Sequence, residues 1–413
     1  MRIAEVAEFY SPTGGGVRSY IDGKFEAARR AGHELYVLAP AAEDGFEPRA
    51  GGGIVKIRSP LLPFDANYRM FWRAAPVHRA LDQLQPDLVE ASSPWRGAWI
   101  AAGWPGRAPR TMFFHADPVA SYPHRWLSSY VSPDRIDRLF EWFWAYLRRL
   151  TTDFQSIVVG GAWLGHRLQA HALERVAAVP LGVDTGAFSP HLRDEGLRAR
   201  LLADCGLPAS GHLLLGVGRF HGEKRWPTVI AAAAAAGADL PLGLVLVGDG
   251  MDRARVERAA AGNPRVRLHG DVRERAELAR IFASGDALVH GCDSETFGLA
   301  TAEAKASGLP LVVPDRGGAA YLAEPDSSET YRAGDAEAGA AAIRRLLARD
   351  PAALRARARH AADSVRSDSE HYAALFDHFA DIVRQGPAVR RSPTSPELAP
   401  QPVAMNGAEL TAS

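Results

Sequence analysis

Residues 294–313 read SETFGLATAEAKASGLPLVV, and this stretch decides the fold. It opens with polar residues, continues into a run of helix formers, and ends in an apolar segment, residues 309–313, that is typical of a buried strand. Two glutamates flank the predicted helix start, because Glu295 precedes it and Glu303 lies inside it. At a rise of ~1.5 Å per helical residue, the two carboxylates can lie roughly 10 Å apart.

The helix start between these glutamates is suited to bind a phosphate group. The first turn of a helix presents unpaired N–H groups and the positive end of the helix dipole, and here that turn begins near Gly298 and Leu299. The carboxylates on either side can accept hydrogen bonds from hydroxyl groups. A ligand with phosphate in the middle and hydroxyls at both ends is a nucleotide sugar.

Strand-like segments alternate with helical segments along most of the chain. This alternation predicts an α/β fold of parallel sheets built from right-handed βαβ units, with ligands at the carboxyl ends of the strands. We expect two facing, doubly wound Rossmann-like domains with a cleft between them. The predicted strands cover residues 3–9, 34–38, 54–57, 88–91, 111–115, 156–159, 213–218, 242–248, 266–269, 287–290 and 309–313.

The domain boundary is expected near the turn PLGVD at residues 180–184. The first domain would then cover residues 1–182 and the second residues 183–370. A helix over residues 371–385 is expected to cross back and brace the first domain. Residues 386–413 contain five prolines and few apolar side chains, which predicts a disordered tail.

Composition excludes several classes of protein. The 413 residues include 48 Lys and Arg against 48 Asp and Glu, so no global field directs the chain to nucleic acid. Cys205 and Cys292 are far apart and lack metal-ligand spacing, which indicates ordinary thiols in a reducing compartment. The N-terminus does not resemble a signal peptide, and no segment approaches the ~20 apolar residues of a membrane span. We expect a cytoplasmic protein.

Two further motifs are candidates for phosphate binding. A glycine turn at residues 14–16 follows the first predicted strand and opens a helix, although a plain tight turn would look the same. Its spacing is not the GxGxxG of dinucleotide-binding folds, which argues against a nicotinamide oxidoreductase. Arg219 and Lys224 follow the strand at residues 213–218 and can converge on one diphosphate, or else be solvated surface cations.

Asp249 and His115 each have two possible interpretations. Asp249, in the turn GDG, could contact ligand hydroxyls, but the simpler interpretation is a cap for a helix beginning near Met251. His115, in FFHADP, could reach the reacting centre or be a satisfied core histidine.

Together these motifs resemble the retaining glycosyltransferases of family 4, which adopt the GT-B fold of two facing Rossmann-like domains. The resemblance extends from the N-terminus to about Arg384 and is strongest over residues 218–318. The matching positions are the glycine loop at Gly15 and Gly16, the linker LGVDTGAFSP at residues 181–190, the basic pair Arg219 and Lys224, and the paired glutamates Glu295 and Glu303 with FGL between them.

The resemblance implies a role for each matching residue. Arg219 and Lys224 would neutralise the donor diphosphate as it leaves, helped by amides at Gly15, Gly16, Gly298 and Leu299. Glu295 would hold hydroxyls of the donor sugar, Glu303 the ribose, and His115 would lie near the sugar and the acceptor. The catalytic set is then Glu295, His115, Arg219 and Lys224.

The implied reaction moves a hexose, with retention, from GDP-mannose or a UDP-hexose to a glycan or glycolipid acceptor. Neither a metal ion nor a cofactor is expected, because no Asp-x-Asp pair is placed to hold a divalent ion on a diphosphate. A sugar-nucleotide epimerase or a non-catalytic sugar-nucleotide-binding protein on the same scaffold remains an alternative, since fold alone does not determine chemistry.

Two positions depart from the family pattern. Gly160 and Gly161 stand where a serine is common, and Gly317–Gly318 lead through two alanines to Tyr321 where a glutamate is often found. These departures put the donor and the local loop shape in question rather than the activity.

Residues 94–150 are unusually rich in tryptophan and arginine. Ser132 and Pro133 predict a helix start, with a stripe of apolar residues that reads as a core face: Ile136, Leu139, Phe140, Phe143, Leu147 and Leu150. Off this stripe lie Trp142, Trp144 and Tyr146, beside Arg148 and Arg149. One hypothesis is a wall that meets an amphiphilic acceptor or a lipid headgroup at a membrane surface; the other is a helix buried on two sides with a solvated basic end.

Overall fold

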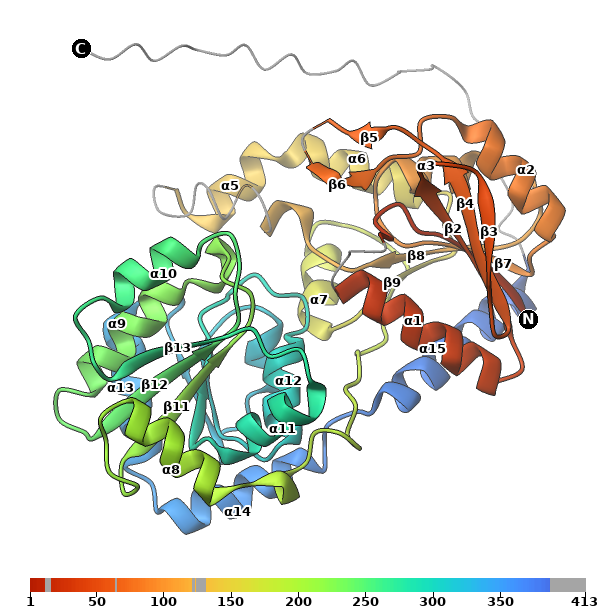
Figure 1. Cartoon of the computed structure of the whole chain (residues 1–413). Coiled ribbons are helices and arrows are strands. Elements are labelled where there is room, and N and C mark those ends of the chain that lie inside the picture. The colour runs from red at the N-terminus through yellow and green to blue at the C-terminus, as the bar shows by residue number, and fades with distance from the viewer. Residues whose placement is uncertain (12–15, 64, 121–122, 124–130, 387–413) are drawn as a thin grey trace.

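The computed structural model describes residues 1–11, 16–63, 65–120, 123 and 131–386, so the expected tail lies outside the described residues from position 387 onward. The described residues form two large sheets, each covered by helices on both faces, and one two-stranded sheet (Figure 1). The first sheet has eight strands in the order β10-β9-β8-β7-β1-β2-β4-β3, and among these β3 alone runs antiparallel to its neighbour. Its strands are β1 (Arg2–Val6), β2 (Glu34–Ala41), β3 (Gly45–Arg49), β4 (Gly52–Arg58), β7 (Leu88–Ala91), β8 (Arg110–Phe114), β9 (Ser156–Val159) and β10 (Val176–Ala178). A separate antiparallel pair consists of β5 (Leu61–Leu62) and β6 (Asp65–Arg69).

The second sheet has six parallel strands in the order β13-β12-β11-β14-β15-β16. Its central strands carry continuous apolar runs, such as LGLVLV in β12, because helices cover both faces. The strands are β11 (His212–Val217), β12 (Leu242–Val247), β13 (Val266–Gly270), β14 (Ala287–Val289), β15 (Leu311–Pro314) and β16 (Ser328–Tyr331). The predicted α/β class and parallel topology are thus confirmed, with strand ends shifted by a few residues. The sequence prediction missed β3, β5, β6, β10 and β16.

Helices cover the sheets in layers. On the first sheet, α1 (Gly16–Arg30) and α15 (Asp368–Gln385) share one core, while the opposite core involves α2 (Ala74–Leu84), α3 (Arg96–Gly103), α6 (Glu141–Thr151) and α7 (Ala162–Ala170). On the second sheet, α9 (Trp226–Ala236), α10 (Arg253–Ala260) and α13 (Ala336–Leu347) lie on one face, and α8 (Glu195–Asp204), α11 (Arg275–Ser284) and α12 (Leu299–Ala306) on the other. The remaining described α-helices are α5 (Pro133–Leu139) and α14 (Pro351–Ala362). No helix in the described ranges is both long and apolar enough to cross a bilayer.

The chain crosses between the two halves twice, at neighbouring points. It leaves the first half after β10 and returns through the start of α15, where Val183 forms a parallel bridge with Ser367. A Cβ at Gly182 would lie 2.1 Å from the carbonyl oxygen of Ser367, so the two crossing segments approach this closely only with glycine. Helix α15 then runs along α1 (Figure 1). Its buried residues include Tyr372, Leu375, Phe376, Phe379 and Ile382, which join the core of the first half.

The single helix expected after Ser132 is divided in two. Helix α5 ends and α6 begins at Phe140, whose backbone (φ −100°, ψ 19°) departs from helical values. Ser132 occupies the N-cap position, but its side chain makes no capping hydrogen bond. Because of the break, Leu139 leaves the expected core stripe and is exposed, while Trp144 is fully buried and stacks on His171 at 3.7 Å between ring centroids. Trp144 therefore cannot belong to an acceptor-facing wall.

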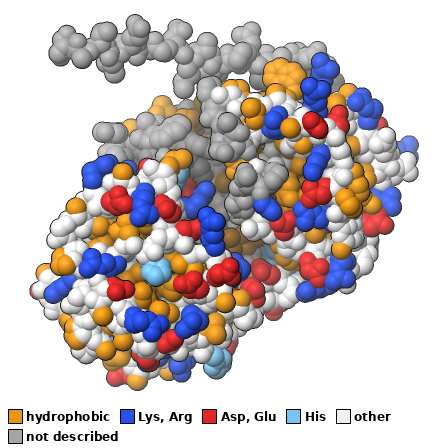
Figure 2. All heavy atoms as spheres, in the orientation of Figure 1, with side chains coloured by type: hydrophobic (Ala, Val, Ile, Leu, Met, Phe, Trp, Pro, Cys, Tyr) orange, Lys and Arg blue, Asp and Glu red, His pale blue; other side chains and the backbone are white. Residues whose placement is uncertain are grey.

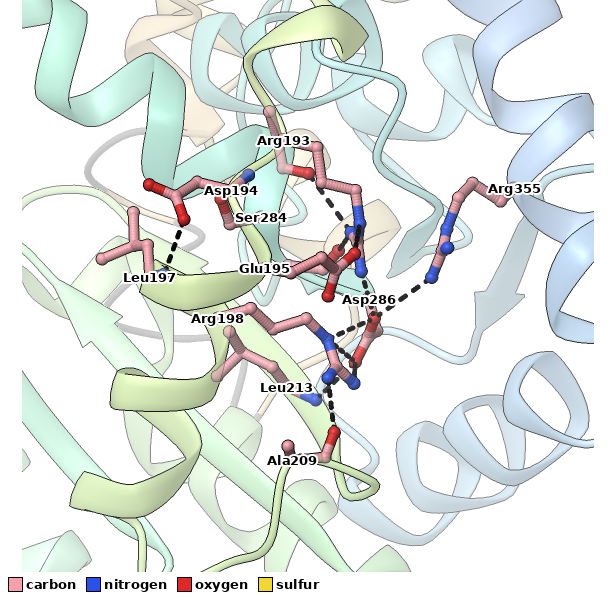
Figure 3. Close-up of polar contacts among 12 residues, drawn as sticks. Arg193, Asp194, Glu195, Leu197, Arg198, Ala209, Leu213, Ser284, Asp286 and Arg355 are labelled. Carbon is pink, nitrogen blue, oxygen red and sulfur yellow. Dashed lines mark hydrogen bonds and ion pairs between the residues drawn. The ribbon is translucent and has the colours of Figure 1, made fainter.

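A cluster of charges joins several elements at the amino end of the second sheet (Figure 3). Asp286, just before β14, accepts hydrogen bonds from the Arg198 guanidinium of α8 (2.6 Å) and from the backbone N–H of Leu213 in β11 (2.8 Å). Arg193 lies 3.3 Å from the same carboxylate, and Arg355 approaches it from α14. Since ligands of such sheets bind at the opposite end, we assign this cluster a structural role.

Candidate active site

Predicted site residues follow strands of both sheets at their carboxyl ends. Gly16 opens α1 after β1, whereas Gly15 lies outside the described residues. A Cβ at Gly16 would meet no atom within 4 Å, so packing inside the described part of the protein does not require a glycine there. The open space beside this helix start leaves room for a ligand to approach the backbone.

Lys224 and Glu295 meet in an ion pair at the centre of the site. Lys224 ends the 3-10 helix η3 (Gly222–Lys224) after β11, and its Nζ contacts Oε1 of Glu295 in the loop after β14. On the other side of the carboxylate, Nε2 of His290 lies 2.7 Å from Oε2. Neither His290 Nε2 nor Glu295 Oε2 is in hydrogen-bond geometry with any described residue. The prediction did not include His290, which follows β14 directly.

The charges in this cluster reinforce one another. Burial disfavours the charged imidazole, but the nearby carboxylate outweighs burial and raises the pKa of His290 to about 9. Burial likewise opposes ionisation of Glu295, yet the charges of Lys224 and His290 hold its pKa well below the usual range. The Glu295 carboxylate raises the pKa of Lys224 against the effect of burial. At neutral pH the site therefore holds two cations around one carboxylate.

Arg219 does not join this cluster. Its side chain is 78% exposed and, among the described residues, forms an ion pair with Glu223 alone, at 3.7 Å. Its backbone is fixed, because the indole of Trp226 donates a hydrogen bond to the Arg219 carbonyl (3.0 Å). The structure thus places Arg219 and Lys224 on one loop, but it does not show the two cations converging on one point as predicted.

The start of α12 matches the predicted phosphate site in its geometry. Gly298 occupies the N-cap position with φ 95° and ψ 63°, a left-handed conformation that favours glycine. Within the part of the chain that the structure describes, no side chain caps the helix, so its first N–H groups lack a side-chain partner there. Leu299 is exposed at this end. A Cβ at Gly298 would lie 3.5 Å from Oε2 of Glu295, so the helix start and the carboxylate are adjacent.

Glu303 lies on α12 and is separate from the Lys224 cluster in its contacts. Arg275 of α11 approaches its carboxylate at 3.3 Å, and the Glu303 side chain is 15% exposed. Burial raises the pKa of Glu303 to about 7, and the Arg275 charge only partly opposes this. Near neutral pH this carboxyl group can therefore either donate or accept a hydrogen bond. The prediction did not include Arg275.

His115 follows β8 and is neutral. Its ring packs against Phe113 (4.6 Å between centroids) and Tyr20 (5.1 Å). Burial lowers the pKa of His115 to about 3, and the positive charge of Lys24 adds to this effect. Its Nε2 is buried and finds no hydrogen-bond partner among the described residues. An unpaired buried nitrogen is costly, which favours a ligand-facing role over a satisfied core histidine.

The two halves touch directly at the site. Thr296, next to Glu295, donates a hydrogen bond through Oγ1 to the carbonyl oxygen of His115 (3.1 Å). A Cβ at Gly161 would lie 2.6 Å from the Thr296 carbonyl oxygen, and so a serine here would require the halves to shift. This explains one of the two departures from the family pattern in physical terms.

Comparisons with known proteins agree with this geometry. Residues 14–187 match the model described as Glycosyltransferase Family 4, and residues 211–349 match the model described as Glycosyl transferases group 1. A GDP-mannose-dependent alpha-mannosyltransferase of Mycobacterium tuberculosis is 34% identical over 79% of this chain and 82% of its own length. The chain belongs to glycosyltransferase family 4. The resemblance seen in the sequence is thereby confirmed.

Other known proteins support the fold and the family. A GDP-mannose-dependent alpha-(1-6)-phosphatidylinositol dimannoside mannosyltransferase of Mycobacterium tuberculosis is 30% identical over 76% of this transferase and 79% of its own chain. Sucrose-phosphate synthase from Thermosynechococcus elongatus superposes with a TM-score of 0.74 at 20% identity, covering 93% of this chain and 100% of the other. HepE from Anabaena in complex with UDP superposes with a TM-score of 0.69 at 15% identity, and the match covers 92% of this chain and 100% of HepE. The fold is GT-B, as expected.

A large cavity of the transferase lies between the two halves, on the side of α7 and α9. Its volume is about 1240 Å³. Glu295, Lys224, Glu303 and His115 do not line it, but Ser294, Glu223 and Arg225 do, which places the cavity beside the pair of Lys224 and Glu295 rather than over it. The lining from the first half includes Asp137, Arg138, Glu141, Trp163, His166 and Arg167, and that from the second includes His221, Glu223, Arg225, Asp293, Arg316 and Tyr321.

Tyr321, the second departure from the family pattern, connects the two halves at this cavity. Its hydroxyl shares a hydrogen bond of 3.0 Å with Nδ1 of His166 on α7. The tyrosine thus serves as a contact between the halves at a position where the family often has a glutamate.

One described group of side chains could in principle hold a metal ion. His290, Cys292 and Glu295 offer donor atoms within 4.8 Å of one another. The chemistry of this set fits a cation poorly, because the Lys224 ammonium already contacts the same carboxylate and would repel a second positive charge.

Asp249 and Lys24 have contacts that were not predicted from the sequence. Asp249 is not a helix cap, because α10 begins with Asp252 at its N-cap, and Asp249 instead pairs with Arg253 at 3.0 Å. Lys24 of α1 is fully buried between Glu5 of β1 and Glu90 of β7, and its Nζ lies 3.0 Å from Oε2 of Glu5. The sequence around Lys24 does not indicate that its side chain contacts carboxylates from two strands.

Proposed function

We propose that the protein transfers mannose from GDP-mannose to a mannose-containing glycolipid, with retention of configuration and without a metal ion, at the cytoplasmic face of a membrane. The observation that carries the proposal is the cluster of Lys224, Glu295 and His290 beside the uncapped start of α12. The names of the relatives, which specify GDP-mannose and a phosphatidylinositol dimannoside, support this donor and acceptor over the UDP-hexoses.

Lys224 and Glu295 would exchange partners when the donor binds. The diphosphate takes the Lys224 ammonium, and the freed Glu295 carboxylate accepts hydrogen bonds from hydroxyls of the sugar. His290 keeps its charge next to Glu295 and so keeps the carboxylate ionised. As negative charge grows on the leaving diphosphate, the ammonium and the amides at Gly298 and Leu299 stabilise it.

The remaining residues would position the ends of the donor. Glu303 hydrogen-bonds the ribose hydroxyls, for which a carboxyl group with a pKa of about 7 is able to donate or accept. The unpaired Nε2 of His115 gains a partner in a sugar or acceptor hydroxyl. Arg219 reaches the diphosphate only after a side-chain or loop movement, such as closure of the halves about the crossing at Val183 and Ser367.

Transfer can be tested with the purified protein, GDP-mannose and a mannosylated lipid acceptor in the presence of EDTA. We expect a mannosylated product with an α linkage, as determined by NMR, and no product from Glu295→Gln, which circular dichroism should show to be folded. GDP-mannose should raise the melting temperature more than UDP-glucose does, because a ligand that binds only the folded state stabilises it. Loss of activity in EDTA, a β-linked product, or epimerisation of donor without acceptor would each contradict the proposal.

A further inference from the structure

Four large apolar side chains are exposed together on the first half of the molecule. Trp142 is 66% exposed, Trp72 65%, Leu139 64% and Trp95 36%. We call these four residues the tryptophan face. They come from the start of α3, the segment before α2, and the α5–α6 region, which lies along the same edge of the molecule as β5 and β6 in Figure 1.

Contacts show that the tryptophan face is continuous. The rings of Trp95 and Trp142 both pack against Phe143, at 5.6 Å and 5.7 Å between centroids. Arg96, adjacent to Trp95, donates a hydrogen bond to the carbonyl oxygen of Trp72 (3.4 Å). Three segments that are distant in sequence therefore lie side by side, and each carries an exposed indole.

Arginines are next to three of these apolar residues in the sequence, since Arg73 follows Trp72, Arg96 follows Trp95 and Arg138 precedes Leu139. The arginines are exposed, and within the described residues none forms an ion pair: Arg73, Arg96, Arg135, Arg138 and Arg149. The neighbouring Glu141 is already paired with Arg148. These arginines add positive charge beside the indoles, and among the described residues only the charge of Arg96 is partly offset, by the buried Glu8, although the whole chain has a net charge of zero.

This combination fits an anionic bilayer surface. Indoles are enriched at membrane interfaces because they present an apolar body and a polar N–H, and arginines add attraction to anionic headgroups. The four residues of the tryptophan face do not line the large cavity. A lipid surface can bind such a face, because it supplies negative charge over a broad area and does not require a groove.

The tryptophan face also adjoins the large cavity. Arg138 and Glu141 line that cavity, and the residues that follow each of them, Leu139 and Trp142, belong to the tryptophan face. The break at Phe140 allows the short α5–α6 segment to serve both surfaces. A membrane on the tryptophan face would lie next to the mouth of the cavity.

We propose that the tryptophan face docks on the surface of an anionic phospholipid bilayer and so holds the cavity against the headgroup of a lipid-linked acceptor. The docking is inferred from the exposure and charge of the side chains alone, whereas the role of the cavity toward a lipid-linked acceptor rests on the proposed function.

Co-sedimentation of the full chain with vesicles tests the docking without donor or acceptor. We expect binding to vesicles of phosphatidylcholine and phosphatidylglycerol at low salt, weaker binding at high salt, and little binding to phosphatidylcholine alone. The triple variant Arg73→Gln, Arg135→Gln, Arg149→Gln should weaken binding by roughly fivefold per arginine. The double variant Trp72→Ser, Trp142→Ser should weaken it at least about tenfold.

Phe46→Ser is the matched control, because Phe46 is 57% exposed but lies on the edge strand β3. It should bind as the wild type does, and circular dichroism should show all variants folded. No binding of the wild type to anionic vesicles at low salt would overturn the proposal. So would an equal loss in Phe46→Ser, or a concentration-dependent dimer that the tryptophan double variant abolishes, since the face would then be an interface between copies.

A second readout separates this inference from the proposed function. If the double variant loses transfer to acceptor in vesicles but keeps transfer to a water-soluble mannoside, docking has failed while chemistry remains. If the wild type binds vesicles but transfers mannose to neither acceptor, the proposed function is wrong and the docking stands.

Discussion

The two ends of β14 carry two charge clusters of opposite character. Before the strand, Asp286 is hydrogen-bonded by Arg198 and by the backbone of Leu213 (Figure 3). After the strand, His290 and Glu295 lie 2.7 Å apart, yet the facing atoms of both lack hydrogen-bond geometry within the described residues. The first cluster is complete in itself, whereas the second retains polar atoms that a ligand can satisfy. Position at the carboxyl end and incomplete pairing together distinguish a binding site from a structural network.

Removing the lysine should have the largest effect, and it should be on activity. Lys224→Met leaves the leaving diphosphate without its buried cation, so we expect the rate of transfer to fall by about 10³-fold in protein that circular dichroism shows to be folded. Initial rates with GDP-mannose measure this. The control is Lys305→Met. Lys305 lies on the same helix as Glu303 and forms an ion pair with Glu324, and its loss should leave most activity. Comparable rates in both variants would remove Lys224 from the mechanism.

Breaking the cluster at the other end of β14 should instead cost stability. Asp286→Ala leaves Arg193 and Arg198 without their buried partner, and we expect the free energy of unfolding to fall by about 3 kcal/mol. Urea denaturation measures this, and kcat/KM of the folded protein should be unchanged. Asp326→Ala, at an exposed pair with Arg357, should change stability by less than ~0.5 kcal/mol. A loss of activity without a loss of stability would contradict the structural assignment.

Glu303 should make stability depend on pH. Its folded-state pKa of about 7 lies above the ordinary value of 4.5, so the folded protein binds the extra proton between these values. Stability from this group is therefore lost as pH rises from 4.5 to 7, by up to roughly 3 kcal/mol. Glu303→Gln should remove this slope, so that the variant is more stable than the wild type above pH 7 and similar below pH 4.5. Parallel pH dependence of unfolding in the two proteins would be the contrary result.

The contact between the halves should give the smallest effect. Gly161→Ala places a Cβ 2.6 Å from the Thr296 carbonyl oxygen and must displace the loop that carries Glu295. We expect kcat/KM to fall about tenfold, because small misplacements of positioned groups are costly. Gly103→Ala, at a helical glycine where a Cβ meets no atom within 4 Å, should leave kcat/KM unchanged. An unaltered rate in Gly161→Ala would show that the contact is not needed for positioning.

The sequence by itself determined the α/β class, the parallel sheets and the family. These follow from local signals: alternating apolar runs and helices, the glycine turns, and motifs whose order along the chain is specific. It also named Glu295, Lys224, Glu303 and His115 as candidates, because they lie in loops after predicted strands or on the helix that follows, and because they match motif positions of the family.

Only the tertiary structure decided which of these residues meet and in what charge state. Lys224 and Glu295 are far apart in the chain, and their pairing, like that of Lys24 with Glu5 and Glu90, depends on how separate strands align. The pKa of His290 is raised against burial by the Glu295 carboxylate, a contact that the sequence prediction did not include. The break at Phe140, which buries Trp144 and exposes Leu139, came from packing that overrides the helical period. Local patterns fix the elements of a fold, whereas charge states and contacts arise from neighbours that the chain brings together only when it is folded.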